Sequence, residues 1–156
     1  MSPLVPCLWF NGQAEDAANF YVSIFPDSAI LDVTRYGEGA PMPAGEAMVV
    51  RFRLNGQEMM ILNGGPHHQL TPAFSLIVPC RDQAETDRYW AALSEGGEEV
   101  ACGWLTDRFG VSWQVVPDEV RQMLGDPDKA RAGRAMEAMM SMKKLEIAPM
   151  RRAFEG

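Results

Sequence analysis

The segment 107–117 reads DRFGVSWQVVP, and it decides how the rest of the chain is interpreted. It combines a turn that contains Gly110 with a short apolar strand whose centre carries an amide, Gln114. An earlier segment has the same form, because GQEMMIL (56–62) aligns with GVSWQVV (110–116) and places Met60 where Gln114 stands. The sequence therefore predicts that this strand occurs twice.

The order of elements around the two copies also repeats. The triplet QAE occurs at 13–15 and again at 83–85, each time inside a pattern with helical spacing and after an apolar strand. The first half predicts strands at 5–10, 30–36, 47–54 and 57–62, a helix over 11–25, and an Asn-Gly hairpin turn at 55–56. The second half predicts a strand at 73–80, a helix over 81–97 ended by a glycine pair, one or two strands within 98–107, and a last strand at 111–117.

We therefore expect an α+β protein made of tandem βαβββ modules that form a curved sheet cup, followed by C-terminal helices. The modules are expected at 1–65 and 66–117, and the helical tail at 118–156, in one structural domain. Three helices are expected in the tail, the second starting at DPDKARAG (126–133) with its first Asp as N-cap and Pro127 in the first turn.

Strand alternation assigns side chains to the two faces of each sheet. In the last strand Ser112, Gln114 and Val116 should face the cup, whereas Trp113 and Val115 should face the helix. In the first module Glu58, Met60 and Leu62 should face the cup.

Composition excludes several functional classes. The 156 residues carry a net charge of −7, which argues against a nucleic-acid groove, and no apolar run reaches the length of a membrane span. The N-terminus has no basic region or cleavage motif of a secretion signal. The three cysteines form no CxxC pair, so neither a disulfide framework nor a zinc ribbon is indicated, and reduced thiols in the cytoplasm are expected.

Seven residues are candidates for contact with a ligand in the cup, although each also has a purely structural interpretation. Gln114 offers a hydrogen-bonding amide, and Trp9 and Trp104 offer aromatic surface. His67 could line the mouth of the cup or lie on a surface loop. Cys80 could be a ligand contact or a small buried hydrophobe. The full set is Gln114, Met60, Ser112, Trp9, Trp104, Cys80 and His67. The methionines of the tail (Met136, Met139, Met140 and Met142) suit packing against the rim of the cup or against a second subunit.

The chain resembles a known family over nearly its whole length. The stretches that carry the resemblance are PCLWFNGQAEDAANFYVSIFPDS, RYGEGAP, LNGQEMMILNGGP, VPCRDQAETDRYWAALSEGG, CGWLTDRFGVSWQVVP and MEAMMSMKKLEI. They are similar to the vicinal oxygen chelate superfamily of glyoxalases, bleomycin-resistance proteins and extradiol dioxygenases, and within it to the PhnB-like subgroup. Members of that subgroup often carry the label 3-demethylubiquinone-9 3-methyltransferase.

The resemblance implies a cup that holds a divalent metal in many relatives, and relatives that commonly dimerise. In metal-using relatives a carboxylate ligand follows the turn glycine of each last strand by four residues, where this chain has Met60 and Gln114. Such residues are poor ligands for Zn²⁺, Fe²⁺ or Mn²⁺, so no metal and no other cofactor is expected.

The favoured interpretation is a small-molecule-binding homodimer without the usual metal, whose partners include neither nucleic acid nor membrane. Two alternatives stay open. One is a metal-dependent lyase, isomerase or dioxygenase-like enzyme with unusual ligands such as His67, Gln114 and a cysteine. The other is a partner-binding scaffold with an inert cup.

Overall fold

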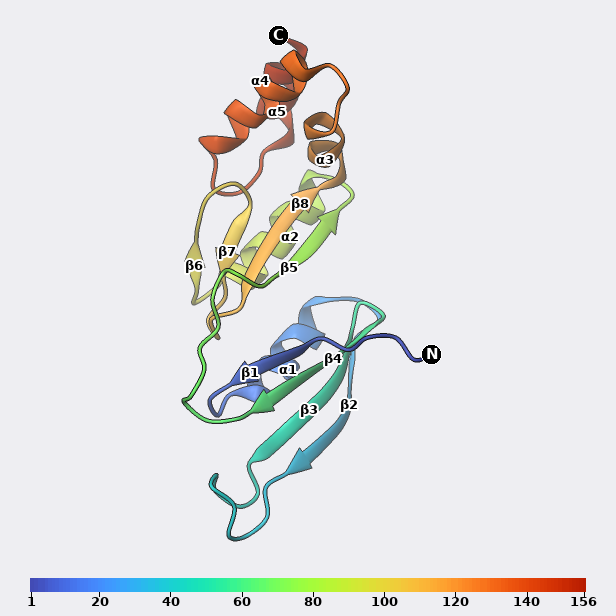
Figure 1. Cartoon of the computed structure of the whole chain (residues 1–156). Coiled ribbons are helices and arrows are strands. Elements are labelled where there is room, and N and C mark those ends of the chain that lie inside the picture. The colour runs from blue at the N-terminus through green and yellow to red at the C-terminus, as the bar shows by residue number, and fades with distance from the viewer. The chain divides into compact units, whose positions relative to one another are not determined.

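The computed structural model describes all residues, 1–156, as two compact units, Met1–Leu70 and Thr71–Gly156. Each unit has one four-stranded sheet with a helix on one face (Figure 1). The predicted α+β class with repeated modules and C-terminal helices is confirmed, and the two sheets are separate and open.

Unit 1 contains β1 (Cys7–Phe10), α1 (Ala14–Ile24), β2 (Ala29–Arg35), β3 (Ala47–Leu54) and β4 (Gln57–Asn63). Its strand order is β1-β4-β3-β2, with β1 and β4 parallel and the other neighbours antiparallel. The apolar stripe of α1 is buried completely at Ala14, Ala17, Ala18 and Tyr21. Asn55 and Gly56 both have positive φ, as expected for the tight turn of the β3–β4 hairpin.

Unit 2 repeats this plan with β5 (Ser75–Cys80), α2 (Gln83–Ser94), β6 (Glu98–Glu99), β7 (Trp104–Thr106) and β8 (Ser112–Pro117). The order is β5-β8-β7-β6, again with the first and last strands parallel. Segment 98–107 therefore holds two short strands. Met60 pairs with Cys7 in one unit and Gln114 pairs with Ile77 in the other, so the internal repeat holds at the level of strand register.

The predicted assignment of side chains to faces is also confirmed in β8 and β4. Trp113 and Val115 are buried on the side that α2 covers, whereas Gln114 and Val116 are only half-buried on the other face. In β4, Met59 and Ile61 are buried and Met60 and Leu62 are half-buried. We call this less covered side the open face of each sheet.

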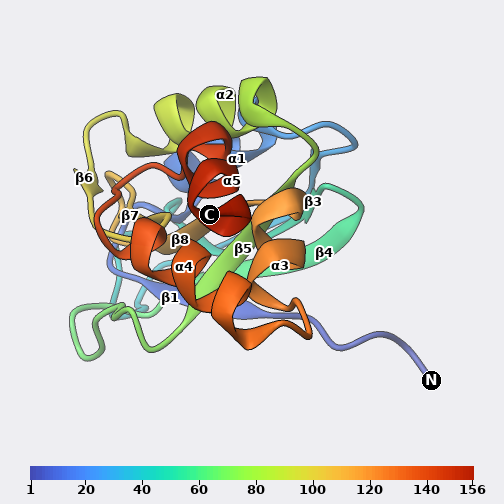
Figure 2. The same cartoon turned by 90° about the horizontal axis from the view of Figure 1, so that it is seen from above.

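The tail folds into α3 (Asp118–Leu124), α4 (Lys129–Met140) and α5 (Ile147–Glu155), which lie side by side within unit 2 (Figure 2). Their shared core contains buried residues from all three helices and from the connector before α5: Val120, Met123, Ala135, Leu145, Ile147 and Met150. None of the chain's helices combines the length and apolar character that a membrane crossing requires.

One boundary in the tail differs from the prediction. Asp128 caps α4, with its carboxylate accepting from the backbone N–H of Ala130 at 3.0 Å and of Arg131 at 3.3 Å. Asp126 instead accepts from the Asp128 N–H in a local turn, and Pro127 lies before the cap. Asp126 and Asp128 lie two residues apart and both are good N-cap residues, so the sequence alone does not decide which of them starts the helix.

Candidate functional site

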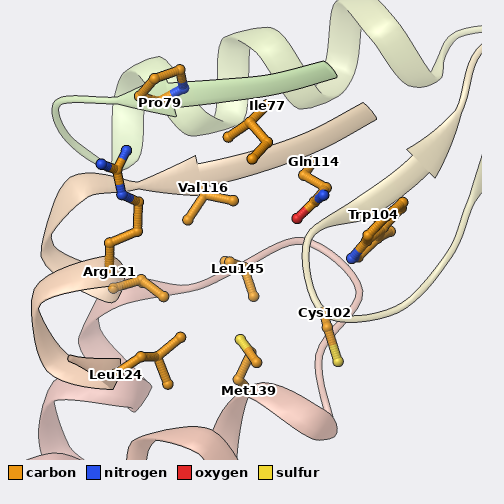
Figure 3. Close-up of a pocket in the computed structure, with 11 residues that line it drawn as sticks. Ile77, Pro79, Cys102, Trp104, Gln114, Val116, Arg121, Leu124, Met139 and Leu145 are labelled. Atoms are coloured by element: carbon orange, nitrogen blue, oxygen red, sulfur yellow. The ribbon is translucent and has the colours of Figure 1, made fainter. Parts of the chain in front are cut away.

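A cavity of about 530 Å³ lies between the open face of the unit 2 sheet and the tail helices (Figure 3). We call it the unit 2 pocket. The sheet side is formed by Ile77, Pro79, Cys102, Trp104, Gln114 and Val116. The tail side is formed by Val120, Arg121, Leu124, Met139 and Leu145.

The sheet register brings Gln114 and Trp104 together at the floor of this pocket. Gln114 is the third of the six residues of β8 and pairs with Ile77 on one side and Trp104 on the other. Its Nε2 donates a hydrogen bond to Ser75 Oγ at 2.9 Å, while its Oε1 accepts none within the chain. The amide is therefore oriented by the protein and keeps an acceptor for something else.

Backbone hydrogen bonds fasten the connector between α4 and α5 to the β6–β7 loop at the edge of the pocket. The N–H groups of Cys102 and Gly103 donate to the carbonyls of Met142 and Lys143, both at 2.8 Å. A Cβ on Gly103 would meet Leu145 Cδ1 at 3.0 Å and the carbonyl oxygen of Val115 at 2.9 Å, so this approach requires glycine. We call the two hydrogen bonds the connector clasp.

The side chain of Gln83, at the start of α2, holds the same connector from the other side. Its Oε1 accepts from the Ile147 N–H at 2.8 Å, and its Nε2 donates to the Leu145 carbonyl at 3.1 Å. Leu145 therefore lies between the clasp at Lys143 and the Gln83 hydrogen bonds to Leu145 and Ile147, and it is only 1% exposed. The connector that carries Leu145 on the tail side of the pocket is thus held in place by hydrogen bonds within unit 2.

The pocket lining is mostly apolar and contains one charged residue, Arg121 of α3. The nearest acidic partner of Arg121 is Asp118 Oδ1 at 3.8 Å, which is too long for a hydrogen bond. Trp104 is half-buried, and its indole N–H donates no hydrogen bond within the chain. The pocket thus offers a ligand an apolar surface, a hydrogen-bond acceptor (Gln114 Oε1), a donor (the Trp104 indole N–H) and a cation (Arg121).

Most of the chain matches a known family. The model of the family described as 3-demethylubiquinone-9 3-methyltransferase matches residues 2–116, well over half of the chain. The chain belongs to this PhnB-like family.

Two solved structures are similar to this chain over almost their whole length. A Bacillus cereus protein described as a putative 3-demethylubiquinone-9 3-methyltransferase, PhnB protein, is 35% identical, with a TM-score of 0.69, over 74% of this chain and 99% of its own. Protein PA1353 from Pseudomonas aeruginosa is 26% identical, with a TM-score of 0.63, over 75% of this chain and 98% of its own.

A more distant match shows the fold alone. The fosfomycin resistance protein FosX from Listeria monocytogenes is 14% identical, with a TM-score of 0.52, over 75% of this chain and 93% of its own. A search of curated proteins gave no match. The family match ends at residue 116, so the three tail helices lie outside it.

The residues at the positions where metal-using relatives are expected to have ligands do not suit Zn²⁺, Fe²⁺ or Mn²⁺. In unit 1 the register pairs Met60 with Cys7, and in unit 2 it pairs Gln114 with Ile77. These are a thioether, a thiol, an amide and an alkyl chain. The Cys7 thiol is a usual Zn²⁺ ligand when deprotonated, but these positions supply neither the three protein ligands that a Zn²⁺ site needs nor the imidazole and carboxylate donors that suit Fe²⁺ and Mn²⁺. No group of three or more His, Cys, Asp or Glu side chains is arranged to hold a metal.

The seven predicted site residues fall into three places. Gln114 and Trp104 line the unit 2 pocket. Ser112 follows the same face of β8 but is only 3% exposed and is not part of the lining.

Three more of the predicted residues, Met60, Trp9 and His67, belong to unit 1. Met60 is half-buried on the open face of β4. The indole N–H of Trp9 donates to the Gly65 carbonyl at 2.9 Å, and its ring meets that of His68 edge-on at 4.7 Å. His67 itself is exposed on the connector. Trp9 therefore fastens the segment after β4, and the N–H that it would offer a ligand is already used.

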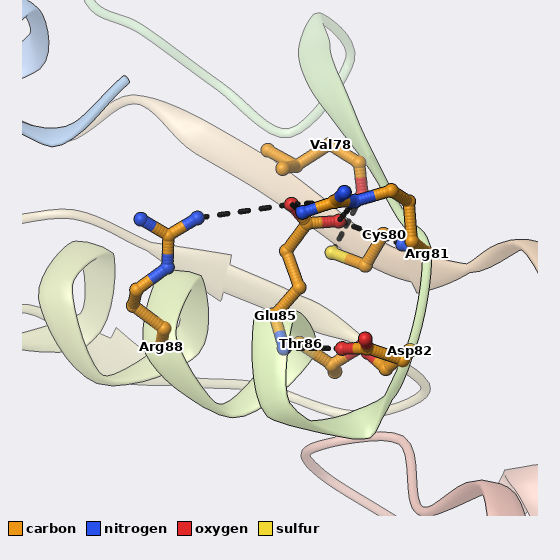
Figure 4. A network of polar contacts seen from close by, with 7 residues as sticks. All are labelled: Val78, Cys80, Arg81, Asp82, Glu85, Thr86 and Arg88. Atoms are coloured by element: carbon orange, nitrogen blue, oxygen red, sulfur yellow. Dashed lines mark hydrogen bonds and ion pairs between the residues drawn. The ribbon is translucent and has the colours of Figure 1, made fainter. Parts of the chain in front are cut away.

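Cys80 points to the α2 side of the unit 2 sheet and is not part of the pocket lining; Figure 4 shows it beside Val78 and the start of α2. It is completely buried against α2, and its thiol donates weakly to the Val78 carbonyl at 3.5 Å. Desolvation raises the pKa of this thiol to about 11. Strand alternation could have found this, because Val78 and Cys80 share the face that packs on the helix.

Sequence reasoning missed the tail's share of the site. Arg121, Leu124, Met139 and Leu145 come from three separate tail segments and converge on one pocket. The available signal was the Met-rich stretch that contains Met139, which predicts packing against the rim of the cup or a second subunit without giving the residues that it meets. Strand alternation shows which side chains share a face of a sheet. No local pattern shows which surface a helix will pack against.

Proposed function

We propose that this chain binds a small organic molecule in the unit 2 pocket, without the divalent metal that many relatives use. The observation that carries the proposal is the pocket itself, which is mostly apolar and has a few polar groups at fixed positions. Its volume of about 530 Å³ lies in the range typical of ligand sites. The amide of Gln114, oriented by Ser75, would anchor a hydroxyl or N–H group of the ligand.

Binding can be tested by calorimetric titration of the purified protein with quinones, aromatic acids and hydrophobic antibiotics. A blocking variant, Ile77→Trp, should abolish binding, because Ile77 is 56% exposed at the pocket and a larger side chain can enter the space without disturbing the core. A matched variant outside the pocket, Leu31→Trp, starts from a similar exposure of 42% in unit 1 and should leave binding unchanged. Equal affinity in both variants would contradict the proposal.

The metal-free part of the proposal rests on donor chemistry and has its own test. Elemental analysis of protein purified without chelators should find no stoichiometric Zn, Mn, Ni or Fe. A stoichiometric metal that is lost in Gln114→Leu would favour the alternative of a metal-dependent enzyme with unusual ligands.

We do not extend the family's methyltransferase description to this chain. Binding of a methyl-donor nucleotide normally uses a glycine-rich loop between a strand and a helix. Here the β1–α1 loop is Asn11-Gly12-Gln13 and the β5–α2 loop is Arg81-Asp82, and neither has that pattern. Methyl transfer from a labelled donor to a quinol is the assay that would reverse this view.

A further inference from the structure

We infer that the unit 2 pocket selects organic anions with a flat apolar body, and that Arg121 of the tail contacts the anionic group. This inference rests on the proposed function and adds the chemical class of the ligand and the residue that determines it. It concerns a part of the chain that lies outside the family match, which ends at residue 116.

The first support is the charge of the lining. Arg121 is the one charged residue among the side chains that form the pocket, in a protein whose net charge is −7. A local cation in an acidic protein is a specific feature of this site and does not follow from its overall composition. The Arg121 side chain is 57% exposed, so water solvates the guanidinium when the pocket holds a neutral ligand, whereas an anionic group would be attracted to it and a cationic group repelled.

The second support is that Arg121 is not used elsewhere in the fold. Arg151, also on the tail, donates two hydrogen bonds to the Glu119 carboxylate at 2.6 and 2.7 Å. Arg134 donates to the carbonyls of Ala153 and Phe154, both at 2.9 Å. Arg121 has only the 3.8 Å ion pair with Asp118, so its planar set of donors is available to a carboxylate, sulfonate or phosphate.

The third support is the arrangement of the polar groups. Figure 3 shows Arg121 on the α3 side of the pocket and Gln114 with Trp104 on the opposite side, while Val116 and Leu145 lie between them. A ligand that spans the pocket therefore meets a cation at one end, apolar surface in the middle, and an indole ring with an amide at the other. Planar aromatic acids have this distribution of charge and apolar surface.

The test compares two fluorescent probes that share an aromatic body. One is 8-anilinonaphthalene-1-sulfonate, which is anionic, and the other is N-phenyl-1-naphthylamine, which is neutral. We expect Arg121→Gln to weaken binding of the anionic probe about twofold to fivefold, as for an exposed ion pair, and to leave binding of the neutral probe unchanged. Added salt should weaken binding of the anionic probe to the wild type more than to Arg121→Gln.

A control variant and the blocking variant make the outcomes distinct. Arg152→Gln removes an exposed arginine of α5 that is not part of the pocket, and it should leave both affinities unchanged. If Arg121→Gln alters both probes equally or neither, while Ile77→Trp still blocks them, the inference is overturned and the proposed function stands. If Ile77→Trp blocks neither probe, or if neither probe binds the wild type, the proposed function fails and the inference fails with it.

Discussion

Asp107 is a buried carboxylate that closes the turn between β7 and β8. Its Oδ1 accepts from the N–H groups of Phe109 and Val111 at 2.8 and 3.0 Å, and its Oδ2 accepts from Trp113 Nε1 at 2.8 Å. The side chain is 3% exposed, so one buried carboxylate accepts from all three donors. This one residue fixes the start of the strand that carries Gln114.

Replacing Asp107 should therefore be costly. We expect Asp107→Ala to lower the free energy of unfolding by about 3 kcal/mol, because buried donors lose their acceptor. Urea denaturation measures the change. Asp16→Ala, at an exposed position of α1, is the matched control and should change stability by less than about 0.5 kcal/mol. A loss of similar size in both variants would show that the carboxylate has no special role.

Cys80 gives a prediction for alkaline pH. Burial raises the pKa of its thiol from 9.0 to about 11 in the folded protein, so between these values the unfolded chain loses the proton first. Stability should then fall as pH rises from about 9 to about 11, and it should fall less steeply in Cys80→Ala. Unfolding measured across that range in both proteins checks this. Parallel curves would contradict it, since all other titrating groups are common to the two.

At the scale of elements, Glu119 and Arg151 join α3 to α5. The hydrogen bonds from Arg151 hold the pKa of Glu119 below its ordinary value of 4.5. A lowered pKa in the folded state means that the contribution to stability is complete above the ordinary pKa and is lost as pH falls through the folded one.

We expect Glu119→Gln to cost about 0.5 kcal/mol at neutral pH, since both partners are substantially exposed, and less near pH 3, where the carboxylate begins to take up a proton. Urea titration at the two pH values tests this. Glu95→Gln, an exposed position without an ion pair, should show no difference at either pH. A cost for Glu119→Gln that is the same at both would mean that the ion pair does not produce it.

The elements themselves could be predicted from the sequence because their signals are local. The Asn-Gly turn at 55–56, the glycine pair after α2 and the alternation in β8 each report the conformation of a few neighbouring residues. The start of α4 was shifted by two residues, since two Asp residues compete for the cap. Of the candidate site, Gln114 and Trp104 could be found because they are strand neighbours. Arg121 and Leu145 could not, because contacts between distant segments leave no local pattern.

At the scale of the whole molecule, the shared cup stays a prediction. The sequence predicts that Met60 and Gln114 face one hollow. The test uses a variant free of native cysteines (Cys7→Ser, Cys80→Ala, Cys102→Ser), to which Met60→Cys and Gln114→Cys are added. We expect a short bis-maleimide to join the two thiols, and the mass of the product to distinguish a link within one chain from a link across the expected homodimer.

A control pair combines Gln114→Cys with Asn19→Cys, which is exposed on α1, the helix on the other side of the unit 1 sheet. This pair should not be joined. The cup prediction would be wrong if the Met60 and Gln114 positions gave no product, or if the control pair gave as much.

The connector clasp provides a way to measure how often the tail connector detaches from the β6–β7 loop. The amide protons of Cys102 and Gly103 are bonded to carbonyls of the tail connector, so they can exchange with heavy water only when the connector leaves this loop. Their hydrogen-exchange rates therefore report how often the connector between α4 and α5 detaches from the β6–β7 loop. A molecule held beneath the connector would slow both protons together, and the two amides would register occupancy without any label attached to the protein.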